Sequence, residues 1–166
     1  MIRVGLGRDL HRLVHGRRFL LGGIELVSDK GELGHSDGDV LAHAVIDAIL
    51  GAAGLGDIGE LFPPSEETWK DADSMELLKA AWGLVNRAHW NLINLDCVVI
   101  CDNPKLLPYR DRIRSSLAQA MGVSSDAVFV KGKTNEGFGP LGEGAAAEAL
   151  AVCLLEHEDR YGNNTL

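Results

Sequence analysis

The chain has 166 residues, of which 46% are hydrophobic and 24% charged, and its formal net charge at pH 7 is −8. This size and composition predict a single globular domain over residues 1–158, followed by a polar tail over 159–166. The acidic balance argues against a nucleic-acid partner, which would require a basic face. No apolar run is long enough to cross a bilayer, and the N-terminus lacks a signal-peptide pattern. We therefore expect a cytoplasmic protein without a membrane partner.

The first half of the chain predicts strands that lead into a long helix. In order, the pattern indicates a strand over residues 2–10, a hairpin over 17–26, a loop over 28–36 and a helix over 38–54. Ser36 or Asp37 is a natural N-cap for that helix, and Asp39 places negative charge in its first turn. The polar loop before the helix could be a plain exposed turn or a lid beside an active site.

The second half alternates helices and strands. The pattern indicates a helix over residues 73–88, a strand over 90–101 that is buried on both faces, a helix over 108–121, a strand over 127–133 and a glycine-rich loop over 134–144. Pro108 suits the first turn of its helix. Residues 145–155 are rich in alanine and leucine, so propensity alone favours a helix there.

Two glycine patterns are not nucleotide fingerprints of the common kinds. Residues 54–59 match G-x-G-x-x-G, but they follow a helix, whereas the dinucleotide motif follows a strand. We interpret them as a helix stop and a tight turn that presents Asp57. The glycine-rich loop over 134–144 lacks the Gly-Lys-Ser/Thr ending of a P-loop. Its free backbone amides could still wrap a phosphate, and Glu136 could hold Mg²⁺ on the same phosphates.

The three cysteines are expected to be reduced and buried. Cys97 and Cys101 lie four residues apart in one strand, which separates them by roughly 13 Å, too far for a disulfide. An odd number of cysteines also argues against an oxidising compartment.

Two polar clusters carry the candidate chemistry. Asp9 and His11 alternate along the first strand and so point the same way. On the long helix, Asp39, His43 and Asp47 are spaced i, i+4, i+8, which places the histidine between two carboxylates. An Asp/His/His set suits a catalytic zinc site or a non-haem iron site. Surface polar groups without a metal would show the same spacing, because spacing does not prove that distant segments meet.

Five ordered segments resemble the motif set of the 2-C-methyl-D-erythritol 2,4-cyclodiphosphate synthase family. They are Asp9-Leu10-His11, His35 to Asp39, His43, Gly56 to Gly59, and Lys131 to Glu136. The resemblance implies a single α/β (α+β) domain with a mixed four-stranded sheet, helices on one face, and a last strand antiparallel to its neighbours. Residues 145–155 would then be a strand despite their helical propensity. It also implies a homotrimer with its sites between subunits.

The family's reaction closes a cyclodiphosphate from a cytidine diphosphate substrate and releases CMP, in non-mevalonate isoprenoid synthesis. The resemblance implies that Asp9, His11 and His43 bind Zn²⁺ or another divalent ion, and that Glu136 binds Mg²⁺ or Mn²⁺ on the diphosphate. Asp47 would orient the metal-side histidine. The expected catalytic residues are His35, Asp47, Lys105 and Thr134.

The resemblance also assigns substrate contacts. His35 and Ser36 would contact the 2-phosphate, and Asp57 and Gly59 would contact the methylerythritol hydroxyls. Phe62 is also expected to bind the substrate. The cytidine and phosphate pocket would be formed by Cys101, Pro104, Lys105, Leu106, Leu107, Gly132, Lys133 and Thr134.

Three positions depart from the family pattern. Pro64 stands where an aspartate is frequent, and Lys133 replaces a frequent threonine. No arginine lies between Leu141 and Ala147, which weakens any case for an anion or isoprenoid site on a trimer axis. Two alternatives stay open, a metal-dependent phosphohydrolase and a trimeric ligand-binding protein without turnover.

Overall fold

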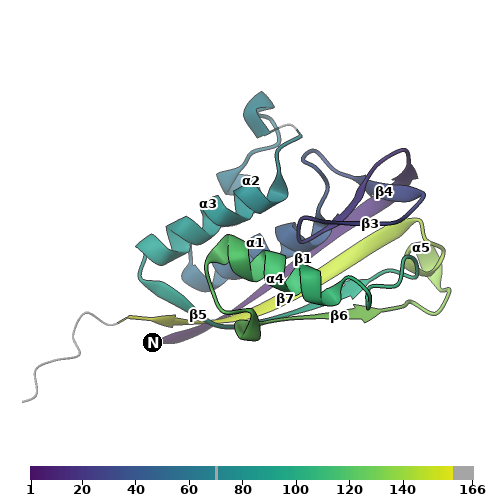
Figure 1. Cartoon of the computed structure of the whole chain (residues 1–166). Coiled ribbons are helices and arrows are strands. Elements are labelled where there is room, and N and C mark those ends of the chain that lie inside the picture. Colours follow the sequence, from purple (N-terminus) through teal and green to yellow (C-terminus); the bar gives the residue numbers. More distant parts are fainter. Residues whose placement is uncertain (70, 159–166) are drawn as a thin grey trace, which may run out of the picture.

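The computed structural model describes residues 1–69 and 71–158, so the expected polar tail lies outside the described residues. Within these residues one mixed sheet carries helices on one face (Figure 1). Its strand order is β4-β1-β7-β5-β6. The strands are β1 (Ile2–His15), β4 (Lys30–Leu33), β5 (Trp90–Ile100), β6 (Val128–Lys133) and β7 (Ala146–His157). No helix of the described part is long and apolar enough to span a membrane.

The sheet has five strands where four were expected. The additional strand is the short β4, which pairs with the polar end of β1 from Arg12 to His15. The loop predicted over 28–36 therefore contains a strand, and β1 continues past residue 10 because β4 supplies a partner for its backbone. A separate two-stranded sheet joins β2 (Phe19–Leu21) and β3 (Ile24–Leu26), which confirms the predicted hairpin.

The long helices pack on the sheet. They are α1 (Val40–Ala53), α3 (Ser74–Arg87) and α4 (Arg110–Met121). The shorter helical segments are α2 (Ile58–Leu61), α5 (Gly139–Gly142) and two 3₁₀ turns at Glu67–Trp69 and Ser125–Ala127. The helix expected from residue 108 begins at Arg110, after Tyr109 as N-cap.

The last stretch is a strand, β7, antiparallel to both β1 and β5. Its alanines favour a helix in isolation, but they are small enough to let α1 lie directly on the sheet centre. Ala147, Ala149 and Ala151 are fully buried. The sheet ladder on both sides overrides the intrinsic preference.

Two glycines of β1 bring α1 into contact with the strand. A Cβ on Gly5 would lie 1.9 Å from the carbonyl oxygen of Ala48, and one on Gly7 would lie 1.9 Å from that of Ala44. Only glycine allows this approach, which sets the distance between β1 and α1. The contact positions the side chains of Asp9 and His43, one on each element.

The N-cap of α1 is Asp39, not Ser36 or Asp37. Its fully buried carboxylate accepts from the backbone N–H groups of Ala42, Gly22 and Gly23, at 2.9, 3.0 and 2.6 Å. It therefore ties the β2–β3 turn to the start of the helix, a contact that local spacing could not indicate.

Strand β5 is buried on one face only. Leu95, Cys97 and Val99 lie in the core, whereas Val98 and Ile100 on the other face are half-buried, so the expectation of two buried faces was wrong for the single chain. All three cysteines are free and buried, as predicted. Burial raises the pKa of Cys101 to about 11, which makes its thiol inert at neutral pH.

Candidate active site

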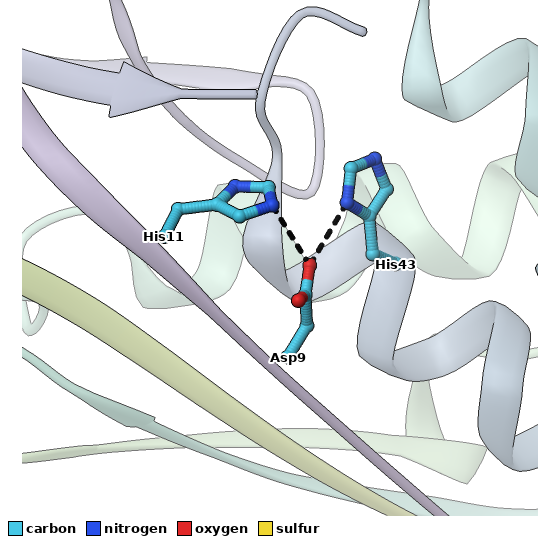
Figure 2. Close-up of side chains that lie close together, drawn as sticks. All are labelled: Asp9, His11 and His43. Carbon is cyan, nitrogen blue, oxygen red and sulfur yellow. Dashed lines mark hydrogen bonds and ion pairs between the residues drawn. The ribbon is translucent and has the colours of Figure 1, made fainter. Parts of the chain in front are cut away.

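Asp9, His11 and His43 converge on one point where β1 meets α1 (Figure 2). The Oδ2 atom of Asp9 lies 2.9 Å from Nδ1 of His43 and 3.1 Å from Nε2 of His11. One ligand atom from each residue lies within 4.8 Å of the others. The two clusters singled out in the sequence therefore meet.

The second nitrogen of each imidazole is held by a separate partner. Nδ1 of His11 lies 2.6 Å from the carbonyl oxygen of Gly38, so it carries the proton and donates. Nε2 of His43 lies 3.0 Å from the hydroxyl of Ser36 and 2.9 Å from that of Ser74. The Ser74 hydroxyl donates to Asp37, so it accepts from His43. Both rings thus direct their other nitrogen at the Asp9 carboxylate.

The electrostatics of the group keep Asp9 ionised and favour a proton on His11. Burial opposes ionisation of Asp9, but hydrogen bonds from His11 and His43 outweigh it and hold the pKa of Asp9 below its ordinary value. Burial also disfavours the charged form of His11, yet its bond to Asp9 prevails and raises the pKa of His11.

The residues fit a divalent ion by donor type and by geometry. Two imidazole nitrogens and one carboxylate oxygen point at a common centre, and the opposite nitrogens are fixed by a carbonyl and by hydroxyl groups. Three protein ligands leave open positions for another ligand, as in catalytic metal sites. Asp9, His11 and His43 could therefore hold such an ion.

Asp47 does not contact the metal group through a hydrogen bond. Its carboxylate accepts from the backbone N–H of Ile58 at 2.9 Å, so it fixes the start of α2. Burial raises its pKa. In this structure the His43 nitrogen that faces away from Asp9 contacts the hydroxyls of Ser36 and Ser74, and Asp47 makes no hydrogen bond to that ring. Ser74 was missed because the sequence marks it only as a helix start.

A cleft of about 220 Å³ adjoins the metal group. It is lined by His11, His35, Ser36, His43, Ile58, Gly59, Phe62, Pro64, Trp69 and Leu77. The predicted residues His35, Gly59 and Phe62 are thus brought beside the metal group. Asp57 precedes this wall as the N-cap of α2, accepting from the Glu60 N–H at 2.9 Å.

A second cleft of about 410 Å³ lies beside β6. It is lined by Cys101, Lys105, Leu106, Leu107, Arg110, Lys131, Gly132, Lys133 and Thr134, which brings together all but one of the predicted pocket residues. The exception, Pro104, is adjacent, and its carbonyl accepts from the Cys101 thiol at 3.6 Å. Arg110 and Lys131 were not predicted as pocket residues: Arg110 belongs to no motif, and Lys131 stands in the last motif segment without an assigned contact.

The two clefts share no lining residue. Glu136 follows β6 and accepts from the Thr134 hydroxyl, so it lies with the second cleft and not in the Asp/His/His group. Asp102 anchors that loop by accepting from the N–H groups of Asn135 and Gly137, at 2.7 and 3.3 Å. Within one chain, the two halves of the expected site are separate.

Fold and site together define an α/β domain with an Asp/His/His group that could hold a divalent ion, and with a separate cleft lined by cationic side chains. The model of the YgbB family matches residues 2–156, and the chain belongs to this family. A relative from Treponema denticola, named 2-C-methyl-D-erythritol 2,4-cyclodiphosphate synthase, is 52% identical over 93% of this chain and 96% of its own length. A relative of the same name from Synechococcus sp. is 52% identical, over 93% and 98% respectively.

Two solved structures are similar to this chain in both fold and sequence. The bifunctional IspDF from Campylobacter jejuni matches with a TM-score of 0.92 at 40% identity, over 96% of this chain and 43% of that chain. A 2C-methyl-D-erythritol-2,4-cyclodiphosphate synthase in its CDP-bound form matches with a TM-score of 0.85 at 40% identity, over 93% of this chain and 100% of that chain. This chain spans less than half of the bifunctional protein.

Proposed function

We propose that this chain converts 4-diphosphocytidyl-2-C-methyl-D-erythritol 2-phosphate to 2-C-methyl-D-erythritol 2,4-cyclodiphosphate and releases CMP. The names of its relatives support the reaction. The observation that carries the proposal is the convergence of Asp9, His11 and His43 on one point beside a cleft. A metal-bound phosphate oxygen would complete the open coordination of such a site.

The reaction needs no protein nucleophile. An oxygen of the 2-phosphate forms a bond to the β-phosphorus, the bond from that phosphorus to the α–β bridging oxygen breaks, and CMP leaves with that oxygen and its electron pair. The protein must bring two anions together and neutralise their charge. Asp9, His11 and His43 would hold a divalent ion, which we propose to be Zn²⁺, and such an ion would supply Lewis-acid polarisation of a phosphate.

The remaining side chains divide between the two clefts. At the first, His35 and Ser36 both line the cleft and would donate to the 2-phosphate. Asp57, Gly59 and Phe62 would receive the methylerythritol end.

At the second cleft, Lys105, Lys133 and Thr134 offer cationic and hydroxyl donors for the nucleotide phosphates. Glu136 would hold Mg²⁺ or Mn²⁺ on the diphosphate. The cytidine would lie against Cys101, Pro104, Leu106, Leu107 and Gly132.

We further propose a homotrimer in which the first cleft of one chain faces the second cleft of another. The separation of the two clefts within a chain supports this. So does the helix-free face of the sheet, where Ile2, Val4 and Leu6 are 63%, 67% and 66% exposed. An apolar row of this kind is a typical subunit interface. Light scattering should give the mass of three chains, and a monomer that retains full turnover would contradict the proposal.

A chromatographic assay of CMP release tests the reaction. His43→Ala should lower turnover at least about a hundredfold and leave the oligomer intact, whereas His15→Ala, an exposed histidine on the same chain, should be fully active. A fully active His43→Ala would overturn the metal assignment. Inorganic phosphate without CMP would indicate a hydrolase, and a metal-loaded protein that leaves the substrate unchanged would indicate a ligand-binding protein.

Complementation tests the shared site. His43→Ala removes a residue of the first cleft and Thr134→Ala one of the second, and each variant alone should be inactive or nearly so. Mixed oligomers, prepared by unfolding and refolding the two together, contain some sites that carry neither substitution. Recovered turnover is expected. If mixing restores nothing although the mixed oligomer forms, each site is complete within one chain.

A further inference from the structure

Arg110 lines the second cleft, yet no motif and no step of the proposed mechanism uses it. It is the first residue of α4, directly after the turn in which the Tyr109 N–H donates to the Leu106 carbonyl at 2.9 Å. This turn also carries Leu106 and Leu107 into the cleft. The backbone therefore holds Arg110 at a fixed place on the cleft wall.

The guanidinium of Arg110 has no hydrogen-bond acceptor among the described residues. Its Nε is buried and unpartnered. The nearest carboxylate oxygen in an ion pair, on Asp111, is 3.6 Å from Nε, and that side chain is 80% exposed. Arginine has five donors, and unpartnered buried donors are rare because they cost free energy. By contrast, the neighbouring Arg114 donates to the carbonyls of Val128 and Ser125, at 2.8 and 3.0 Å.

An aromatic contact orients this guanidinium without using its donors. Its Cζ lies 5.5 Å from the ring centroid of Phe129 on β6, and the Cζ of Arg114 lies 5.1 Å from the same centroid. A cation over an aromatic face is attracted electrostatically, and the N–H groups at the edge of the guanidinium stay available. The side chain is thus prepared to donate to a ligand.

The place where Arg110 contacts β6 indicates which part of a nucleotide it would bind. Thr134 and Glu136, which we assign to the phosphates, follow the C-terminal end of β6. Phe129 lies five residues before Thr134, roughly 16 Å along an extended strand. Arg110 therefore contacts β6 well before the residues that we assign to the phosphates. Between them Leu106 packs on Gly132, where an added Cβ would lie 2.9 Å from that of Leu106.

We propose that Arg110 is a substrate-binding residue that donates a hydrogen bond to an acceptor atom on the edge of the pyrimidine base. The inference rests on the proposed function, because it assumes that the second cleft takes the cytidine. It adds a positioned guanidinium to a cleft that Lys131 also lines, and the ammonium of Lys131 is already paired with Asp96. A charged donor on a neutral acceptor is strong enough to matter for affinity.

The test is an NMR titration of the intact protein with cytidine, CMP and ribose 5-phosphate. Arg110→Met keeps the length of the stem and removes the donors. Arg112→Met on the same helix is the matched control, because Arg112 lines a different surface depression. We expect Arg110→Met to lower the affinity for cytidine and for CMP by the same factor, about tenfold. The affinity for ribose 5-phosphate should not change. Arg112→Met should bind all three ligands as the wild type does.

The three ligands separate the ways in which the inference can fail. Cytidine binding that is unchanged in Arg110→Met overturns it, and a loss confined to CMP and ribose 5-phosphate shows that the arginine contacts phosphate. In both cases the wild type still binds CMP and the proposed function survives. A wild-type protein that binds neither cytidine nor CMP overturns the proposed function as well.

Discussion

Removing the hydroxyls behind His43 should weaken metal binding without disturbing the ligands. Nε2 of His43 has two hydroxyl neighbours, Ser74 at 2.9 Å and Ser36 at 3.0 Å. Ser74→Ala leaves the second hydroxyl in place, so we expect a loss of less than about tenfold in affinity, or 1.4 kcal/mol. The double variant Ser36→Ala/Ser74→Ala leaves the ring N–H of His43 without an acceptor, and only 9% of this residue is exposed.

An unpartnered buried donor costs about 1–3 kcal/mol, and lost partners behind metal ligands typically cost about 10–100-fold in affinity. We therefore expect the double variant Ser36→Ala/Ser74→Ala to bind Zn²⁺ about 10–100-fold more weakly than the wild type. Competition titration against a chromophoric chelator at pH 7.5 measures this. Ser115→Ala, on an exposed part of α4, is the control. Wild-type affinity in the double variant would refute the assignment of His43 orientation to these hydroxyls.

Three further outcomes follow from the buried groups and the close contacts. Burial raises the pKa of Glu32 well above its ordinary value, so the folded chain retains a proton that the unfolded chain loses above about pH 4.5. Stability therefore falls as pH rises above that value. In thermal unfolding, the free energy of unfolding of Glu32→Gln should exceed that of the wild type by at least about 1 kcal/mol at pH 8 and should equal it near pH 4. A pH-independent difference would contradict this. The pKa of His11 is raised, so a proton competes with the metal ion for its ring. Zn²⁺ affinity should therefore fall about tenfold per pH unit below that pKa. A constant affinity in calorimetric titrations from pH 8 to 6 would argue against His11 as a ligand. Gly7→Ala should lower the free energy of unfolding, measured by chemical denaturation, by more than about 3 kcal/mol, because its Cβ would lie 1.9 Å from the Ala44 carbonyl oxygen. Gly51→Ala, with nothing within 4 Å of the added Cβ, should instead be neutral or stabilising.

Much of the fold could be predicted because its signals are local. Helical spacing indicated α1 and α3, and the run of apolar residues before Cys101 indicated β5. The identity of β7 as a strand could not come from local signals, because its alanines suit either state. Its place between β1 and β5 decides the matter, and the pairing with β1 joins segments more than a hundred residues apart. The resemblance to the family supplied what local preference could not.

For the candidate site, too, local signals indicated some residues, whereas others could be found only from the folded structure. Asp9 and His11 could be paired from strand alternation, and His43 followed from the motif set. The partners that orient the histidines could not be predicted, because Ser74 and the Gly38 carbonyl reach them only through tertiary contact. Helical spacing correctly put Asp47 on the face of α1 that carries His43, but the competing N–H of Ile58 takes its carboxylate.

Phosphorus NMR of the reaction mixture tests the central claim most directly. Purified protein with Zn²⁺ and Mg²⁺ is incubated with 4-diphosphocytidyl-2-C-methyl-D-erythritol 2-phosphate, with and without a chelator, and the Asp9→Asn variant is run in parallel. We predict equal amounts of CMP and a cyclic diphosphate from the wild type, and neither product after chelation or from the variant. Release of inorganic phosphate, or a cyclic product that persists in metal-free protein, would contradict the account.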